Sequence, residues 1–90
     1  MKKTWTLKFS KGVEKKLDTL DPMMRKRILA FFYQRVLKQN DPKLFGKPLT
    51  AGLSGYWSYR IGDYRVLADI QEKELIIFAF DIGHRSTIYH

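Results

Sequence analysis

Hydrophobic and polar residues alternate at the start of the chain and then recur at helical spacing. Over residues 4–9 the period is two, with Trp5, Leu7 and Phe9 on one side, which predicts a half-buried strand. Ser10 belongs to a residue type that caps helices, and a short first helix is expected to follow it. The apolar positions of this helix are Val13, Leu17 and Leu20.

A second helix is predicted from Asp21-Pro22 to about Gln39. An aspartate followed by a proline is typical of a helix start, because the aspartate caps it and the proline lacks the N–H group that would need a partner. The helix has a broad apolar stripe, which we interpret as core: Met24, Ile28, Phe32 and Val36, flanked by Leu29, Phe31 and Leu37. Its basic residues are expected to face water: Arg25, Lys26, Arg35 and Lys38.

Residues 40–55 lack a regular period and are predicted to form a loop rich in glycine and proline. A loop of this length in a small domain is either functional or a connection that only crosses the molecule, and the sequence leaves both interpretations open. Lys43 and Lys47 lie on it and are candidate phosphate-binding residues.

The second half of the chain is predicted to form three strands, over about residues 56–61, 64–70 and 75–82. Glycine in the first position of the two-residue loop Gly62-Asp63 favours a type II′ turn, which places Arg60 opposite Arg65. The last strand, LIIFAF, is apolar on both faces, as a central strand would be. We therefore predict an α+β fold of order β-α-α-β-β-β. Two N-terminal helices pack on one face of a largely antiparallel sheet, in a single domain over residues 1–90.

The chain is strongly basic, with 17 lysines and arginines against 9 acids and a formal charge of +8. This charge favours a polyanionic partner such as nucleic acid, or an acidic protein. There is no cysteine, no signal-peptide pattern, and no apolar stretch near the roughly 20 residues of a membrane span. We expect a soluble, cytoplasmic protein with no membrane contact.

Two arginines directly opposite each other on a strand pair repel, so Arg60 and Arg65 need an explanation. A phosphate between them would remove the repulsion, because the planar guanidinium group binds phosphate through a fork of N–H donors. The alternative is neutralisation by Asp63, Asp69 or Asp81.

The end of the chain adds His84, Arg85 and Tyr89, which are expected to share one face with Arg60 and Arg65. Histidine exchanges protons near neutral pH, arginine stabilises charge on phosphate, and tyrosine stacks on bases. Each also has an ordinary alternative: a turn residue, a solvated charge and a ring packed at a strand edge. No metal site is indicated, because His84 and His90 are the only histidines and no carboxylate cluster accompanies them.

Any catalysis by these residues would proceed without a cofactor. RNA cleavage by the substrate's own 2′-hydroxyl group needs only a base, an acid and positive charge around the phosphate. Arginine stays protonated, so His84 is the candidate base.

The segments GKPLTAGLSGYWSYRIGDYRVLADI and IGHRSTIY resemble the RelE/ParE superfamily of bacterial toxin–antitoxin toxins, with the RelE branch the most similar. The resemblance implies the fold predicted above. It also implies a ribosome-dependent endoribonuclease, an mRNA interferase that cuts translated mRNA in the A site by 2′-hydroxyl attack and inhibits translation. The positions carried over are Arg60, Arg65, Arg85 and Tyr89. Some relatives have a lysine implicated in catalysis where this chain has Ser58. We therefore expect His84 to act as the base in place of that lysine.

The resemblance also implies a cognate RelB-like antitoxin that covers the basic face and binds promoter DNA, so that the toxin reaches DNA only through the complex. On the ribosome the expected partners are mRNA and rRNA. Two alternatives stay open. One is a ParE-like toxin that inhibits DNA gyrase without enzymatic activity and is not expected to need the chain-end residues. The other is a relative that only binds RNA or an antitoxin.

Overall fold

The computed structural model describes residues 4–86. The strands and helices are β1 (Thr6–Phe9), α1 (Lys11–Thr19), α2 (Pro22–Phe31), β2 (Lys47–Pro48), β3 (Trp57–Ile61), β4 (Tyr64–Gln71) and β5 (Ile76–His84). Three short helical turns complete the chain: the π-helical turn η1 (Phe32–Val36) and the 3₁₀ turns η2 (Pro42–Phe45) and η3 (Ala51–Leu53). Within the described residues, no helix has the length and apolar character needed to cross a bilayer.

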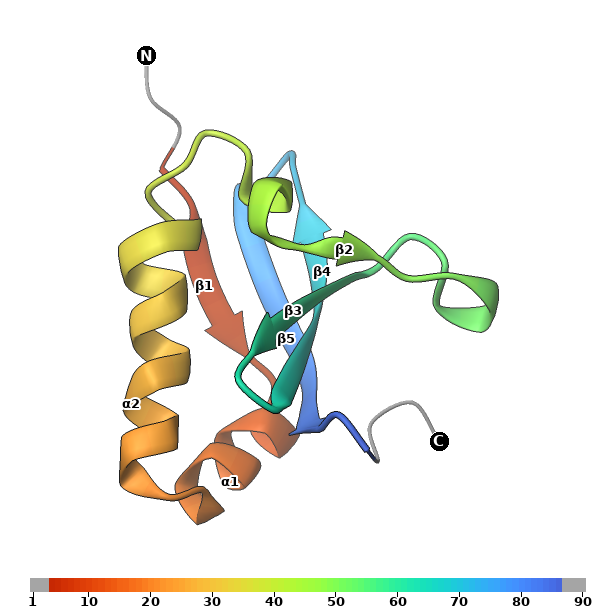
Figure 1. Ribbon diagram of the computed structural model, residues 1–90. Helices are drawn as coiled ribbons and strands as arrows, with labels where there is room; N and C mark the ends of the chain where they lie inside the picture. Colours follow the sequence, from red (N-terminus) through yellow and green to blue (C-terminus); the bar gives the residue numbers. More distant parts are fainter. Residues whose placement is uncertain (1–3, 87–90) are drawn as a thin grey trace.

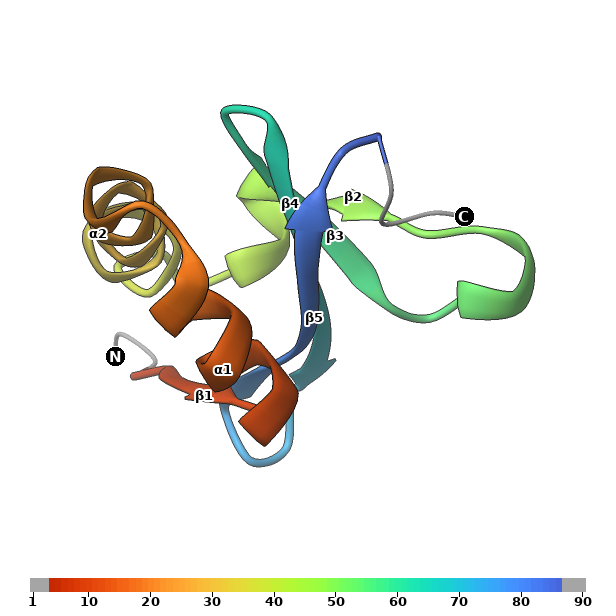
Figure 2. The same ribbon diagram turned by 90° about the horizontal axis from the view of Figure 1, so that it is seen from below.

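The five strands form one sheet in the order β1-β5-β4-β3-β2. β1 is parallel to β5 and the other pairs are antiparallel, so the sheet is mixed and largely antiparallel. Figures 1 and 2 show α1 and α2 on one side of the sheet, while the loop that carries η3 projects on the other side. The predicted α+β fold is confirmed, and LIIFAF is central because β5 lies between β1 and β4.

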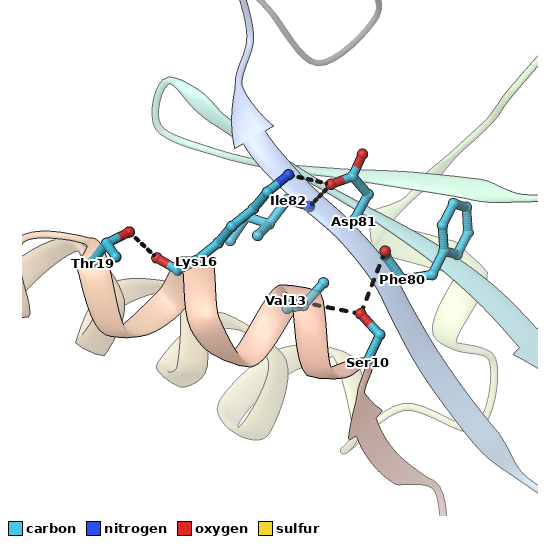
Figure 3. A network of polar contacts seen from close by, with 7 residues as sticks. All are labelled: Ser10, Val13, Lys16, Thr19, Phe80, Asp81 and Ile82. Carbon is cyan, nitrogen blue, oxygen red and sulfur yellow. Dashed lines mark hydrogen bonds and ion pairs between the residues drawn. The ribbon is translucent and has the colours of Figure 1, made fainter.

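Both helices begin where the sequence predicts. Ser10 Oγ accepts a hydrogen bond of 3.1 Å from the N–H group of Val13, and Asp21 Oδ2 accepts from the N–H groups of Met23 and Met24. Figure 3 shows how α1 is held to β5: Lys16 Nζ donates to Asp81 Oδ1 at 2.8 Å. The capping residues Ser10 and Asp21 therefore predicted both helix starts correctly.

The second helix departs from the prediction at its end. Instead of continuing as an α-helix to Gln39, α2 ends at Phe31 and widens into η1, where the N–H group of Leu37 donates to the carbonyl of Phe32 at 2.8 Å. Phe32 and Val36 are both fully buried in this turn. Such wide turns are rare and have no sequence signature, which is why periodicity alone missed this one.

The core lies between the helices and the sheet. Its fully buried members from the helical side are Ile28, Phe32 and Val36, and those from the sheet are Tyr59, Ala68, Ile77 and Ala79. The rings of Phe32 and Tyr59 meet edge to face with centroids 5.1 Å apart. The Tyr59 hydroxyl donates to the carbonyl of Pro42 at 2.7 Å, and this bond ties the loop after η1 to the sheet.

The segment 40–55 is more ordered than predicted, because it contributes η2, η3 and the short strand β2. β2 pairs with the start of β3, with Lys47 opposite Ser58 and Pro48 opposite Trp57. The chain passes close to Tyr59 here, since a Cβ atom on Gly46 would lie 3.1 Å from its ring. A strand of two residues is too short to show a period, so the sequence could not reveal it.

Candidate functional site

The β3–β4 hairpin has the predicted register. Ile61 pairs with Tyr64 and Arg60 with Arg65. Gly62 has φ +60° while Asp63 is not among the residues with positive φ, as in a type II′ turn. Tyr59, Ile61 and Val66 of these strands belong to the core under the helices. Arg60 and Arg65 are their neighbours along the strands and project from the opposite side, which we call the outer face.

The three carboxylates considered as neutralising groups all have contacts elsewhere. Asp81 binds Lys16, Asp69 accepts from the amide of Gln71, and Asp63 Oδ1 lies 3.8 Å from Nε of Arg85. Within the described part of the chain, none of them is within ion-pair distance of Arg60. This arrangement favours an external anion as the partner of Arg60.

Arg85 is brought to the same end of the sheet as the hairpin turn. Its backbone N–H group donates to the carbonyl of Asp63 at 2.8 Å, and its guanidinium group lies beside the Asp63 carboxylate. The turn therefore fixes the segment after β5, although the two are more than twenty residues apart in sequence. The structure therefore places Arg85 at the same end of the sheet as Arg60 and Arg65.

His84 lies differently from the expectation that the candidate residues share one face. It pairs with Tyr64, and the two rings meet edge to face with centroids 5.7 Å apart, whereas Gly83 is the residue opposite Arg65. His84 is thus on the helix side at the end of the strand, because neighbours along a strand alternate in side. The Nδ1 atom of His84 lies 2.8 Å from Oγ of Ser86 and 3.2 Å from the backbone nitrogen of Ser86.

The two loop lysines, Lys43 and Lys47, lie in different parts of the molecule. Lys47 stands opposite Ser58 and so shares the outer face with Arg60. Lys43 lies at the other end of β4, where its Nζ is 2.6 Å from Glu72 Oε1 and 5.6 Å from the Trp57 ring centroid. The hydrogen bond with Glu72 raises the pKa of Lys43. The structure therefore separates Lys43 from the arginines. Tyr89 lies outside the described residues.

The structure shows two further groups of side chains that were not predicted as groups. Tyr56, which is 38% exposed, meets Phe80 edge to face with centroids 4.9 Å apart. Figure 3 shows the Phe80 ring on the side of β5 away from α1, that is, on the outer face. Phe80 sits at a register shift between Leu67 and Ala68, and strand alternation in the sequence does not reveal such a shift.

The second group surrounds a cavity of about 330 Å³ between α2, η1 and the end of β3. Its polar lining comes from Arg27, Gln34, Arg35 and Arg60, and its apolar lining from Ala30, Phe31 and Ile61 with Gly62. Arg27 and Arg35 carry no sequence signal beyond their charge, and their common position depends on how α2 and η1 pack beside the hairpin. In the described chain, no group of three or more His, Cys, Asp or Glu residues is placed to hold a metal ion.

The sequence matches the family model described as ParE toxin of type II toxin–antitoxin system, parDE, over residues 7–89. The chain therefore belongs to the ParE toxin family, within the RelE/ParE superfamily, and is the toxin of a type II toxin–antitoxin system. Among curated relatives, Toxin RelG of Mycobacterium tuberculosis is 28% identical over 85 residues, which are 94% of this chain and 95% of that protein.

Solved structures agree with this assignment. The RelBE2 toxin–antitoxin complex of Mycobacterium tuberculosis has a chain with a TM-score of 0.82 and 26% identity, matched over 92% of this chain and 93% of that one. The archaeal RelE–RelB complex of Pyrococcus horikoshii gives 0.72 and 25%, over 94% and 99%. The free RelE toxin variant of E. coli gives 0.77 at 16% identity, over 97% and 90%, and shows the fold alone.

Proposed function

We propose that this toxin is a ribosome-dependent endoribonuclease that cleaves translated mRNA in the A site and thereby inhibits translation. The observation that carries the proposal is the arginine pair Arg60–Arg65 on the outer face, with Arg85 fixed beside the same turn. A like-charged cross-strand pair costs stability, so an anionic substrate accounts for its presence. The similarity to Toxin RelG and to RelE structures supports the RelE-type activity.

The proposed reaction uses the 2′-hydroxyl group of the RNA as the nucleophile. Its oxygen bonds to the adjacent phosphorus while the bond from phosphorus to the 5′ oxygen breaks, which leaves a 2′,3′-cyclic phosphate and a free 5′-hydroxyl group. A base takes the proton of the 2′-hydroxyl group and an acid protonates the departing 5′ oxygen. Arg60, Arg65 and Arg85 stabilise the negative charge that develops on the phosphate.

His84 is proposed to be the base that takes the proton of the 2′-hydroxyl group, because histidine exchanges protons near neutral pH. Its side chain is exposed at the end of β5, directly before Arg85. Tyr89 is proposed to hold or stack on the substrate, and Lys47 and Lys43 to bind RNA phosphates, with Lys43 first leaving Glu72. No metal or other cofactor takes part in this scheme.

We also propose that a RelB-like antitoxin covers the basic outer face in the resting cell. The structures of RelBE2 from Mycobacterium tuberculosis and of RelE–RelB from Pyrococcus horikoshii are toxin–antitoxin complexes, which supports a partner of this kind. The formal charge of +8 suits both an acidic antitoxin segment and RNA. Promoter DNA would be bound by the antitoxin of the complex, and the toxin acts in the cytoplasm.

The test is a primer-extension map of a translated reporter mRNA after brief induction of the wild-type toxin, Arg65→Ala or Lys73→Ala. Lys73 is an exposed residue in the β4–β5 turn, at the far end of the sheet, so its variant removes the same charge away from the site. We expect cuts only upstream of an introduced stop codon, present with Lys73→Ala and lost with Arg65→Ala. Cuts in untranslated sequence would contradict ribosome dependence.

The second candidate is a non-enzymatic inhibitor of DNA gyrase, which the ParE description of the matching family favours. It makes the opposite prediction in the same experiment. Growth would stop while the reporter mRNA stays intact, and supercoiling by purified gyrase would fall when the toxin is added.

A further inference from the structure

The cavity between α2 and the hairpin carries a cluster of positive charge that shares Arg60 with the arginine pair. Three of its lining side chains are guanidinium groups, those of Arg27, Arg35 and Arg60, and no carboxylate lines it. Among residues 4–86, none of these three arginines forms an ion pair. Three like charges around one hollow repel each other, and an anion placed there would remove the repulsion.

Arg60 belongs both to this cavity and to the outer face. β2 pairs only with Trp57 and Ser58, so the rest of β3 is a free edge of the sheet at the level of Arg60. The Arg60 side chain bends back over the turn, where its Nε donates to the carbonyl of Gly62 at 3.4 Å. From this position the guanidinium group lies between the outer face and the cavity.

Local backbone geometry places the other two arginines. Gly62 has no side chain, and a Cβ atom there would lie 3.0 Å from Nη1 of Arg27, so the glycine lets Arg27 rest against the turn. The wide turn η1 brings both Gln34 and Arg35 to the cavity wall. Wide turns of this type are frequent at functional sites.

We propose that this cavity is a second RNA-binding subsite, in which Arg27 and Arg35 hold backbone phosphates of the same strand whose reacting phosphate lies on the outer face. This inference rests on the proposed function and extends it. The guanidinium groups then form one track, from Arg85 and Arg65 over Arg60 to Arg27 and Arg35. A polymer with regularly spaced anions satisfies such a track, because each guanidinium group takes a phosphate through its planar fork.

The test compares two doubly substituted toxins with the same loss of charge. Arg27→Gln/Arg35→Gln removes the subsite. Lys11→Gln/Lys15→Gln removes two exposed charges from α1, outside the cavity. The probe is a fluorescent single-stranded RNA oligomer with 2′-O-methyl riboses, which cannot be cleaved, and its affinity is measured by anisotropy over a series of KCl concentrations.

The logarithm of affinity falls with the logarithm of salt by about 0.7 for each single-strand phosphate contact. The slope is therefore expected to be less steep by about 1.4 in Arg27→Gln/Arg35→Gln and unchanged in Lys11→Gln/Lys15→Gln. Equal changes in both variants, no change in either, or no binding by the wild-type toxin overturns the proposal. So does unchanged RNA affinity with a loss of affinity for a glutamate-rich peptide, which would assign the cavity to an acidic protein.

The proposed function is judged separately in this design. Cuts in translated reporter mRNA by the wild-type toxin test the endoribonuclease, whereas the salt slopes test the subsite. A toxin that cleaves mRNA but shows unchanged slopes retains its proposed function and lacks the subsite.

Discussion

The two faces of the sheet are built by different physical rules. The face under α1 and α2 is lined by fully buried apolar side chains such as Ile77 and Ala79, which stabilise the fold by packing. The outer face carries the like-charged pair Arg60–Arg65, which packing and local electrostatics alone would disfavour. The difference indicates that stability depends mainly on one face and the proposed activity on the other, although the same strands supply both.

The largest effect is expected from the covered face, with Phe32→Ala. Phe32 is completely buried and meets the rings of Phe31 and Tyr59, so its loss leaves a cavity in the core. The free energy of unfolding should fall by about 3–5 kcal/mol, measured by urea denaturation. Tyr33→Ala is the matched control, because Tyr33 is half exposed and should change stability by about 0.5 kcal/mol or less.

A smaller loss is expected from Tyr59→Phe, which removes only a hydroxyl group. Without it the buried Pro42 carbonyl loses the hydrogen bond from Tyr59, at a cost of about 1–3 kcal/mol in the free energy of unfolding. The matched control is Tyr33→Phe, which removes an exposed hydroxyl group and should leave stability unchanged.

The same tyrosine predicts a pH dependence. Burial raises the pKa of Tyr59, so above the ordinary tyrosine pKa of about 10 the unfolded chain ionises this group while the folded protein does not. Stability therefore falls as pH rises from about 9 to 12, and part of this fall should be absent in Tyr59→Phe. Identical alkaline denaturation curves for wild type and variant would contradict the burial argument.

The extent to which sequence predicted structure also differs between the two faces. The helix starts at Ser10 and Asp21 and the register of Arg60 with Arg65 follow from neighbouring residues, and all were predicted. The wide turn η1 and the shift at Phe80 have no local signature. Both features depend on packing between segments that are distant in sequence, and a single stretch of sequence carries no information about that packing.

The candidate site shows the same limit. Arg60, Arg65 and Arg85 were predicted from turn chemistry and motif, whereas Arg27 and Arg35 lie beside the hairpin only through the packing of α2 and η1. The expectation that His84 shares the face of the arginines was wrong, because register places it opposite Tyr64. The last strand was predicted to end at about residue 82, whereas β5 continues to His84 and so fixes the side on which His84 lies.

A still smaller effect on stability is expected at the β3–β4 turn, with Gly62→Ala. Gly62 has φ +60°, a conformation that costs a residue with a Cβ atom about 1 kcal/mol, and the new methyl group would also displace Arg27. Thermal or urea unfolding measures this loss. Gly52→Ala is the control, since Gly52 lacks a positive φ and a Cβ atom there has no heavy atom within 4 Å, so stability should not fall.

The smallest effect, and the one opposite in sign, is expected on the outer face with Arg60→Gln. Removing one of two charges that stand directly opposite should raise the free energy of unfolding by about 0.2–1 kcal/mol while weakening RNA binding. The gain should shrink in about 1 M salt, because the repulsion between exposed charges is screened. Lys8→Gln is the matched control: Lys8 is an exposed strand residue opposite Phe78, so its loss removes the same net charge without relieving a facing pair. If Arg60→Gln lowers stability at both salt concentrations, the contact of Arg60 with Gly62 contributes more to the fold than the repulsion costs, and the separation of the two faces fails at this residue.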